Sequence, residues 1–233
     1  MTSRYAIFYA PEEGSALADF GDRWLGRNPR TGRSLRQPKV ASIPVESMKA
    51  LTENPRHYGF HATLKPPFRL AEGKSKAALL DAVADFASGT MMWEGPNLVV
   101  STIGTFLALR PSKTAPALDA MAADCVRAFD DFRAPLTDEE VAKRRPDTLT
   151  DRQRRNLETW GYPHVMQDFR FHMTLTNSLP SLLRARAQIA LVTRFQEMSN
   201  SPFCLEALSV FCQADKKSAF RLIGRFPLRS ISE

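Results

Sequence analysis

The chain has 233 residues, of which 43% are hydrophobic and 24% are charged, and its formal net charge is +7 at pH 7. These proportions are ordinary for a soluble globular protein. No apolar run approaches the roughly 18 residues that a membrane span needs, and the apolar start of the chain is too short for a signal peptide. The three cysteines lack the spacing of a metal site and are predicted to be free thiols, so we expect a cytoplasmic protein.

The positive charge favours an anionic partner, such as a phosphate ester or a nucleic acid. A basic surface of solvated side chains gives the same net charge, so charge alone leaves both interpretations open. Nothing in the sequence sets the oligomeric state.

The first half of the chain alternates between strand and helix patterns. Residues 5–10 form an apolar strand that Pro11 ends, and residues 15–25 carry apolar side chains at helical spacing. Residues 27–45 are rich in Arg, Gly and Pro and predict a long surface loop. The further predicted elements are a short helix over residues 45–52, a strand that carries His61, a helix over 74–87, and strands over 98–101 and 105–109.

The second half repeats this alternation after a helix predicted over residues 114–129. Residues 133–160 are polar and charged, and Thr137-Asp138-Glu139-Glu140 has the pattern of a capping box, so we expect short helices there. The remaining predicted elements are a strand over residues 168–176, a helix over 181–198 and a hairpin of strands over 205–213 and 219–226. This order predicts a single domain over residues 1–233, a layered α+β or α/β fold of two related lobes, with a charged helical insertion near 133–160.

The pattern His-x-Thr-Leu occurs twice, once in each half of the chain. It reads His61-Ala62-Thr63-Leu64 and then His172-Met173-Thr174-Leu175, and each copy follows a phenylalanine. The chain has four histidines, so half of them lie in this one context. Two matched histidines half a chain apart predict two similar lobes that each bring one imidazole to a shared site. A pair of imidazoles can act as acid and base near neutral pH, where histidine titrates.

Strand geometry gives each copy an apolar face and a polar face, because successive strand residues point to opposite sides. On the first strand His61, Thr63 and Lys65 share one face. On the second strand Arg170 and Thr174 flank the histidine on the matching face. This set suits a phosphodiester: histidines move protons, threonines bond the non-bridging oxygens, and cations neutralise charge. The alternative is a sheet surface whose two histidines are merely hydrogen-bonded.

Other candidate residues have plainer interpretations. His57 has the strand parity of His61, but no Asp, Glu or Cys accompanies the two at ligand spacing, so we expect no metal site. Tyr162, in the turn Trp160-Gly161-Tyr162-Pro163, either stacks on a base or sugar or anchors the packing. The run Lys143-Arg144-Arg145 either borders an anion site or, given its acidic neighbours, forms a solvated helical face, which is the commoner outcome.

Paired His-x-Thr motifs on two strands resemble the 2H phosphoesterase superfamily, which includes the bacterial LigT-like RNA 2′,3′-cyclic phosphodiesterases and the eukaryotic cyclic phosphodiesterases. The chain looks closest to the uncharacterised phosphonate metabolism proteins of bacterial phosphonate-utilisation operons. That resemblance is carried by residues 4–7 (RYAI), 24–27 (WLGR), 58–70 (YGFHATLKPPFRL), 132–136 (FRAPL), 160–163 (WGYP) and 169–176 (FRFHMTLT).

The resemblance implies an α+β, bilobal LigT-like fold, with two pseudo-symmetric antiparallel sheet lobes, outer helices and a central cleft. Carried over residue by residue, His61 and His172 become the catalytic pair, and Thr63 and Thr174 hold the phosphate. The superfamily needs no metal or other cofactor. The charged segment 133–160 has no clear counterpart in the short RNA-processing members and is a candidate cap over the cleft.

These observations predict a metal-independent phosphoesterase that opens a cyclic phosphodiester by two-histidine acid–base catalysis. Further residues are candidates for substrate binding through their charge or their aromatic ring. They are Lys65, Arg69 and Arg170 for phosphate, and Tyr5, Tyr58 and Tyr162 for the organic part. The substrate is either a small phosphorylated ribose cyclic phosphate, as in phosphonate metabolism, or a 2′,3′-cyclic nucleotide or RNA end. The sequence is also compatible with RNA ligation and with a non-catalytic module that binds phosphate or RNA, and no membrane partner is expected.

Overall fold

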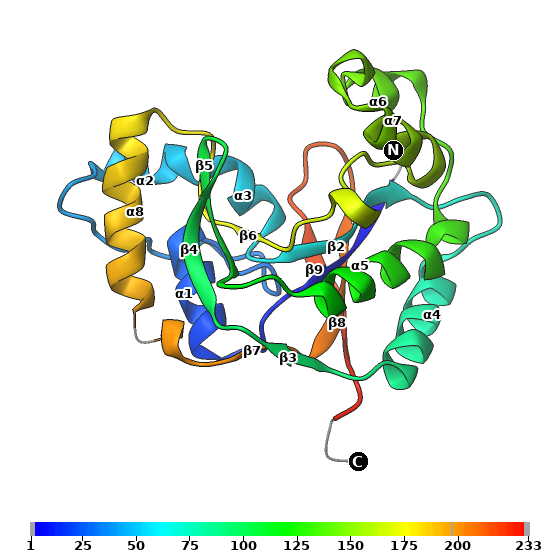
Figure 1. Ribbon diagram of the computed structural model, residues 1–233, viewed down its shortest axis with the longest axis horizontal. Coiled ribbons are helices and arrows are strands. Elements are labelled where there is room, and N and C mark those ends of the chain that lie inside the picture. The colour runs from blue at the N-terminus through cyan, green and yellow to red at the C-terminus, as the bar shows by residue number, and fades with distance from the viewer. Residues whose placement is uncertain (1–2, 197, 231–233) are drawn as a thin grey trace.

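The structure is a computed structural model that describes residues 3–196 and 198–230. Outside that part lie the first two residues of the amino-terminal segment, the last three residues of the predicted domain, and position 197 of the helix predicted over 181–198. The described residues form a mixed α+β fold with a mostly antiparallel sheet (Figure 1). None of the described helices is both long and apolar enough to cross a lipid bilayer.

The described strands are β1 Arg4–Tyr9, β2 Ala62–Arg69, β3 Trp93–Gly95, β4 Leu98–Ile103, β5 Phe106–Pro111, β6 Met173–Thr174, β7 Phe203–Leu205, β8 Ala207–Gln213 and β9 Arg221–Pro227. Seven of them form one sheet in the spatial order β4-β5-β6-β2-β1-β8-β9, and each neighbouring pair is antiparallel. Strands β3 and β7 pair separately. The short strand β6 therefore joins the β4–β5 hairpin to the four remaining strands.

The described α-helices are α1 Ala16–Leu25, α2 Val45–Leu51, α3 Glu53–Tyr58, α4 Lys76–Gly89, α5 Pro116–Ala128, α6 Asp138–Ala142, α7 Asp151–Trp160 and α8 Ser181–Phe195. Short 3-10 turns are η1 Asp130–Phe132, η2 Pro146–Thr148, η3 Met166–Asp168 and η4 Met198–Asn200. In Figure 1, α8 stands beside β4 at one end of the molecule, and α4 and α5 lie at the other end, where they contact β9 and β2. Helices α6 and α7 project from the body near the amino terminus.

Strand β1 divides its side chains between two cores, as its alternation predicts. Ile7 and Tyr9 lie in the main core, which α1, α4, α5 and α8 cover. Ala6 and Phe8 point to the other side, into a small aromatic cluster that includes Phe211. Fully burying an apolar side chain of this size stabilises the fold by about 1.5–3 kcal/mol, so both faces of β1 are fixed by packing.

Most predicted elements are confirmed. Residues 27–44 contain no described helix, the insertion is helical in pieces, and Thr137 forms the predicted capping box with Glu140. A second capping box, between Thr150 and Gln153, starts α7.

The strand predicted over residues 168–176 is wrong at its start. Asp168 ends the turn η3, and regular pairing is limited to the two residues of β6. The guanidinium of Arg170 donates to the carbonyl oxygens of Gln167 and Phe169. This local contact satisfies carbonyls that a longer strand would offer to its neighbours.

Candidate active site

The two motif copies meet at one antiparallel pair of strands. Strands β2 and β6 are neighbours in the sheet, and their register joins Ala62 to Met173. Each of these two residues directly follows the motif histidine of its own copy. Because positions on either side of an antiparallel pair face each other, the histidine of each copy lies toward the threonine of the other. The sheet thereby brings the two halves of the predicted site together.

His61 is held by contacts on three sides. Its Nδ1 lies 2.8 Å from the carbonyl oxygen of Gly59, and its Nε2 lies 3.3 Å from the hydroxyl oxygen of Thr63. Its ring stacks on Phe8, with 3.9 Å between ring centroids and an interplanar angle of 27°. Since a carbonyl oxygen can only accept, Nδ1 carries the hydrogen and Nε2 is the basic nitrogen of the neutral ring.

Gly59 sets the direction in which the chain enters this motif. It ends α3 with a φ of 86°, a left-handed value that favours glycine. A Cβ at this position would lie 2.6 Å from the Cβ of Pro29, so a larger residue would displace the neighbouring loop. The same glycine supplies the carbonyl that fixes His61.

His172 repeats the local geometry of His61. Its Nδ1 lies 2.7 Å from the carbonyl oxygen of Arg170, again the residue two positions earlier. Its ring lies 5.9 Å from the ring of Phe106, measured between centroids. Both histidines are therefore fixed in the same tautomer by the same backbone contact, which leaves Nε2 of each as the nitrogen that can exchange a proton.

The surroundings of the two imidazoles disfavour their charged forms. Burial lowers the pKa of His61 to about 4. The hydrogen bond to the Gly59 carbonyl acts in the opposite direction and raises this pKa, whereas the charge of His172 lowers it further. Burial also lowers the pKa of His172, opposed by the Arg170 carbonyl and assisted by His164. Both rings are therefore mainly neutral at pH 7.

A cavity of about 330 Å³ opens at this place, and five of the predicted residues line it. These five are Tyr58, His61, Thr63, Tyr162 and Thr174. His172 is not itself among the lining residues, but Phe106, whose ring touches it, is. The lining residues include no Asp or Glu. The described walls therefore offer one imidazole, that of His61, together with hydroxyls, amides, aromatic rings and guanidinium groups.

Two arginines that line the cavity were not among the residues predicted to bind substrate. Arg4, at the start of β1, has its guanidinium carbon 5.6 Å from the ring centre of Phe220. Arg144, just after α6, has its guanidinium carbon 4.7 Å from the ring centre of Tyr162. The sequence left two interpretations of residues 143–145 open, and the structure places Arg144 on the border of a cavity. The acidic residues beside it in the sequence gave no sign of this.

Lys65 lies on the other side of β2 from the cavity, which corrects the prediction that it binds phosphate. Its ammonium donates to the carbonyl oxygen of Val126 and to the carboxylate of Asp130, each at 2.9 Å, and the side chain is 1% exposed. The register between β1 and β2 shifts between Thr63 and Lys65. Such a bulge breaks the alternation of faces, so the two side chains no longer point the same way.

The other predicted cations also lie away from the cavity wall. Arg69 forms an ion pair with Glu140 at 3.0 Å and so ties β2 to α6. Arg170 is occupied by the backbone carbonyls that precede the second motif. Neither residue lines the cavity, because each is satisfied by a partner in or next to the insertion.

The remaining predicted residues divide in the same way. Tyr58 and Tyr162 line the cavity, whereas Tyr5 is 8% exposed and belongs to the main core. His57 lies in α3 and not on the strand of His61. Its Nε2 lies 3.0 Å from the amide nitrogen of Gln213.

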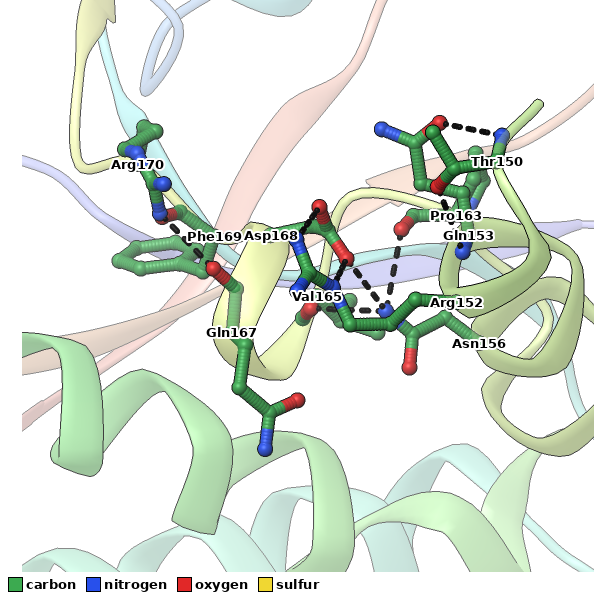
Figure 2. A network of polar contacts seen from close by, with 10 residues as sticks. All are labelled: Thr150, Arg152, Gln153, Asn156, Pro163, Val165, Gln167, Asp168, Phe169 and Arg170. Atoms are coloured by element: carbon green, nitrogen blue, oxygen red, sulfur yellow. Dashed lines mark hydrogen bonds and ion pairs between the residues drawn. The ribbon is translucent and has the colours of Figure 1, made fainter. Parts of the chain in front are cut away.

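Helix α7 holds the segment that leads into the second motif, as Figure 2 shows. Arg152 forms an ion pair with Asp168, with 2.7 Å between Nε and Oδ2. The buried amide of Asn156 donates to the carbonyl oxygens of Pro163 at 3.2 Å and Val165 at 3.1 Å. The insertion is thus anchored directly beside the approach to His172.

The described part of the chain contains no group of three or more His, Cys, Asp or Glu side chains that could hold a metal ion. The three cysteines are free thiols, as predicted.

Comparison with known proteins finds relatives over most of the chain. Two curated relatives carry the name ribose 1,5-bisphosphate phosphokinase PhnN. The one from Janthinobacterium sp. (strain Marseille) is 40% identical over 177 residues, which cover 76% of this chain and 39% of the relative. The one from Laribacter hongkongensis (strain HLHK9) is 33% identical over 224 residues, which cover 94% of this chain and 50% of the relative. The chain therefore spans half or less of the length of these relatives.

A family model described as "Protein of unknown function (DUF1045)" matches residues 63–221. The match begins inside the first motif, takes in the whole second motif and covers more than half of the chain. The chain belongs to this DUF1045 family.

Proposed function

We propose that this protein is a phosphoesterase of the 2H type that hydrolyses a cyclic phosphodiester without a metal ion, with His61 and His172 as its acid–base pair. The observation that carries the proposal is that both imidazoles are held by the same kind of hydrogen bond. Each Nδ1 is bound by a backbone carbonyl two residues earlier, so each Nε2 is left for proton transfer. Two unrelated histidines would have no reason to share a tautomer and a register.

The sheet supports a bilobal interpretation of the fold. The β4–β5 hairpin lies on one side of β6, and β2, β1, β8 and β9 lie on the other. The register between β2 and β6 has the single pair Ala62 and Met173. On this proposal each group of strands is one lobe, and the cleft between the lobes is the cavity that His61 lines.

His61 is the proposed base and His172 the proposed acid. Burial lowers the pKa of His61 to about 4, so its Nε2 is unprotonated at the start of the reaction. The pKa of His172 is lowered less, and the negative charge of a bound phosphodiester favours its protonated form. Thr63 and Thr174 line the cavity and donate hydrogen bonds to the non-bridging phosphate oxygens.

In the proposed step, water attacks the phosphorus and gives its proton to Nε2 of His61. The bond from phosphorus to one ring ester oxygen breaks, and that oxygen takes the proton from Nε2 of His172. The products are a phosphate monoester and a free hydroxyl group. The histidines end in exchanged protonation states and return to their starting forms through solvent. Acid and base catalysis by positioned side chains contributes about 10²- to 10⁴-fold to such reactions.

The favoured substrate class is a small phosphorylated ribose that carries a cyclic phosphate. Two observations favour it over an RNA end. The sequence resembles proteins of phosphonate-utilisation operons, and the two relatives are named for an enzyme of ribose 1,5-bisphosphate.

The name of the relatives favours a second candidate function, phosphoryl transfer to ribose 1,5-bisphosphate. We place it second because 39% and 50% of the relatives are matched, so the named activity can belong to their unmatched part. The Gly-Lys-Ser sequence at residues 73–75 also departs from the phosphate-binding loop pattern, since Phe68 stands where that pattern has its first glycine.

A substrate panel tests the proposal. The purified protein is assayed with EDTA against ribose 1,2-cyclic phosphate esters, 2′,3′-cyclic nucleotides and RNA with a cyclic-phosphate end. We expect turnover of one class, lost in both His61→Ala and His172→Ala and kept in Arg155→Gln, which removes an exposed cation of α7. No turnover of any class would contradict the proposal. Phosphoryl transfer from ATP with Mg²⁺ would then establish the second candidate, and phosphate or RNA binding alone would indicate a binding module.

A further inference from the structure

Arg4 and Arg144 differ from the other cations near the cavity in having no ion-pair partner among residues 3–196 and 198–230. Lys65 is paired with Asp130, and Arg69 with Glu140. The cavity lining, which contains both unpaired arginines, includes no Asp or Glu that would neutralise them. Unpaired guanidinium groups around an acid-free cavity attract an anion.

Aromatic rings hold both guanidinium groups in place. Arg4 lies over Phe220, and its Nε donates to the side-chain oxygen of Gln213 at 2.8 Å. Arg144 lies over Tyr162. A guanidinium that rests its face on a ring keeps its N–H edge free for a phosphate, which it can bind through two parallel hydrogen bonds.

Tyr58 separates these arginines from the reacting end of the cavity. Its ring stacks on Phe220, with 5.0 Å between centroids and an angle of 15°, and its centroid lies 5.9 Å from that of His61. It also lies near Tyr162, whose pKa is raised mainly by burial and in part by Tyr58. The order Arg4, Phe220, Tyr58, His61 therefore sets the cation two aromatic rings away from the imidazole.

We propose that Arg4 and Arg144 form a second anion subsite, which binds a phosphate monoester at the far end of a substrate whose cyclic phosphate lies at His61. This inference rests on the proposed function and adds which residues bind the second phosphate group of the favoured substrate class. The organic part between the two phosphates lies against Tyr58 and Tyr162. A sugar ring suits this place, since aromatic side chains line the cavity between the two subsites.

The subsite also gives the insertion a role in substrate selection. Arg144 follows α6, which is tied to β2 by the Arg69–Glu140 pair at 3.0 Å and to the β8–β9 loop by Lys216 and Glu139 at 3.5 Å. Arg69 is thus a positioning residue for Arg144, acting through Glu140. A chain without Arg144 would keep both histidines and lose half of the second subsite.

The test compares ribose 1,2-cyclic phosphate with its 5-phosphorylated form in wild type, Arg4→Gln, Arg144→Gln and the control Arg155→Gln. Loss of one charge-assisted hydrogen-bonding group corresponds to about a 10- to 100-fold loss of affinity. We expect each cavity variant to raise KM for the phosphorylated substrate by that factor, with kcat changed less. The unphosphorylated substrate and the control should not respond. Equal effects on both substrates, or no effect on either, would overturn the inference.

A binding measurement separates this inference from the proposed function. If neither substrate turns over, calorimetry with ribose 1,5-bisphosphate and ribose 5-phosphate still reports on the subsite. Weaker binding of both ligands by about 10-fold or more in Arg4→Gln and Arg144→Gln, with Arg155→Gln unchanged, would support the subsite. Unchanged binding would overturn it. Circular dichroism verifies that each variant is folded, and if Arg4→Gln is not, Arg144→Gln alone decides, since its side chain makes no hydrogen bond to the described residues.

Discussion

The two motif copies present the same chemical groups, but different parts of the structure hold each copy in place. His61 leads into β2, an eight-residue strand with β1 and β6 as neighbours, and its ring stacks on the buried Phe8. His172 leads into β6, which has two residues, and the segment before it is held by side chains of α7. The backbone contact to Nδ1 is nevertheless the same. A matched pair of imidazoles thus depends on the sheet in one half and on the insertion in the other.

The largest expected effect is on turnover and tests whether the two copies are equal partners. Replacing His61 or His172 by Ala should each lower kcat by about 10²- to 10⁴-fold, since each removes one proton-transfer group. Steady-state kinetics on the cyclic ester identified by the substrate panel measures both losses. A variant with both changes should lose little more than either one, because the groups act in one step. Full activity in either single variant would refute the pairing.

The threonines test whether both copies hold the same phosphate. Thr63→Val and Thr174→Val each remove one hydroxyl from the cavity wall and keep the side-chain shape. Each should lower kcat/KM by about 10- to 100-fold if the hydroxyl bonds a charged oxygen. A loss confined to one copy would show that the phosphate binds to one lobe alone.

Asn156 tests the dependence of the second copy on α7. Asn156→Ala leaves the buried carbonyl of Pro163 without a donor and removes one of the two donors to the carbonyl of Val165, so the free energy of unfolding should fall by about 1–3 kcal/mol. Chemical denaturation measures this loss, and the exposed neighbour Arg155→Ala should stay within about 0.5 kcal/mol of wild type. Activity should fall with Asn156→Ala through a shift of His172. An unchanged free energy of unfolding would contradict the anchoring role.

The smallest expected effect is a displaced pH optimum. The base must be unprotonated, so kcat/KM should rise with pH through about 4, the lowered pKa of His61. The acid must be protonated, so kcat/KM should fall as pH rises through the pKa of His172, which lies below its usual 6.5. The profile should be a bell with its maximum on the acid side of neutrality. A maximum above pH 7 would contradict the assignment of the two pKa values.

Local patterns predicted much of the fold, five of the ten predicted site residues line one cavity, and the failures have identifiable physical causes. The sequence predicted strand β1, helix α5 and the β8–β9 hairpin correctly, because the apolar side chains of each element repeat on the face that is buried. The direction of the Lys65 side chain was predicted wrongly. A bulge changes which face of the strand the following residues point to, and no feature of the sequence indicates this bulge. The sequence could not decide between the two interpretations of Arg144, because its orientation depends on contacts between α6 and distant parts of the chain. Whether the histidines catalyse a reaction stays a prediction.

Nuclear magnetic resonance of ¹⁵N-labelled histidine side chains tests the central claim, that one phosphate group is shared by His61 and His172. The account predicts that both rings carry hydrogen on Nδ1 and that both pKa values lie below 6.5 in the free protein. Titration with inorganic phosphate should raise both pKa values over the same range of phosphate concentration, since the anion stabilises each imidazolium. A response of one ring alone, or hydrogen on Nε2 of either neutral ring, would contradict the account.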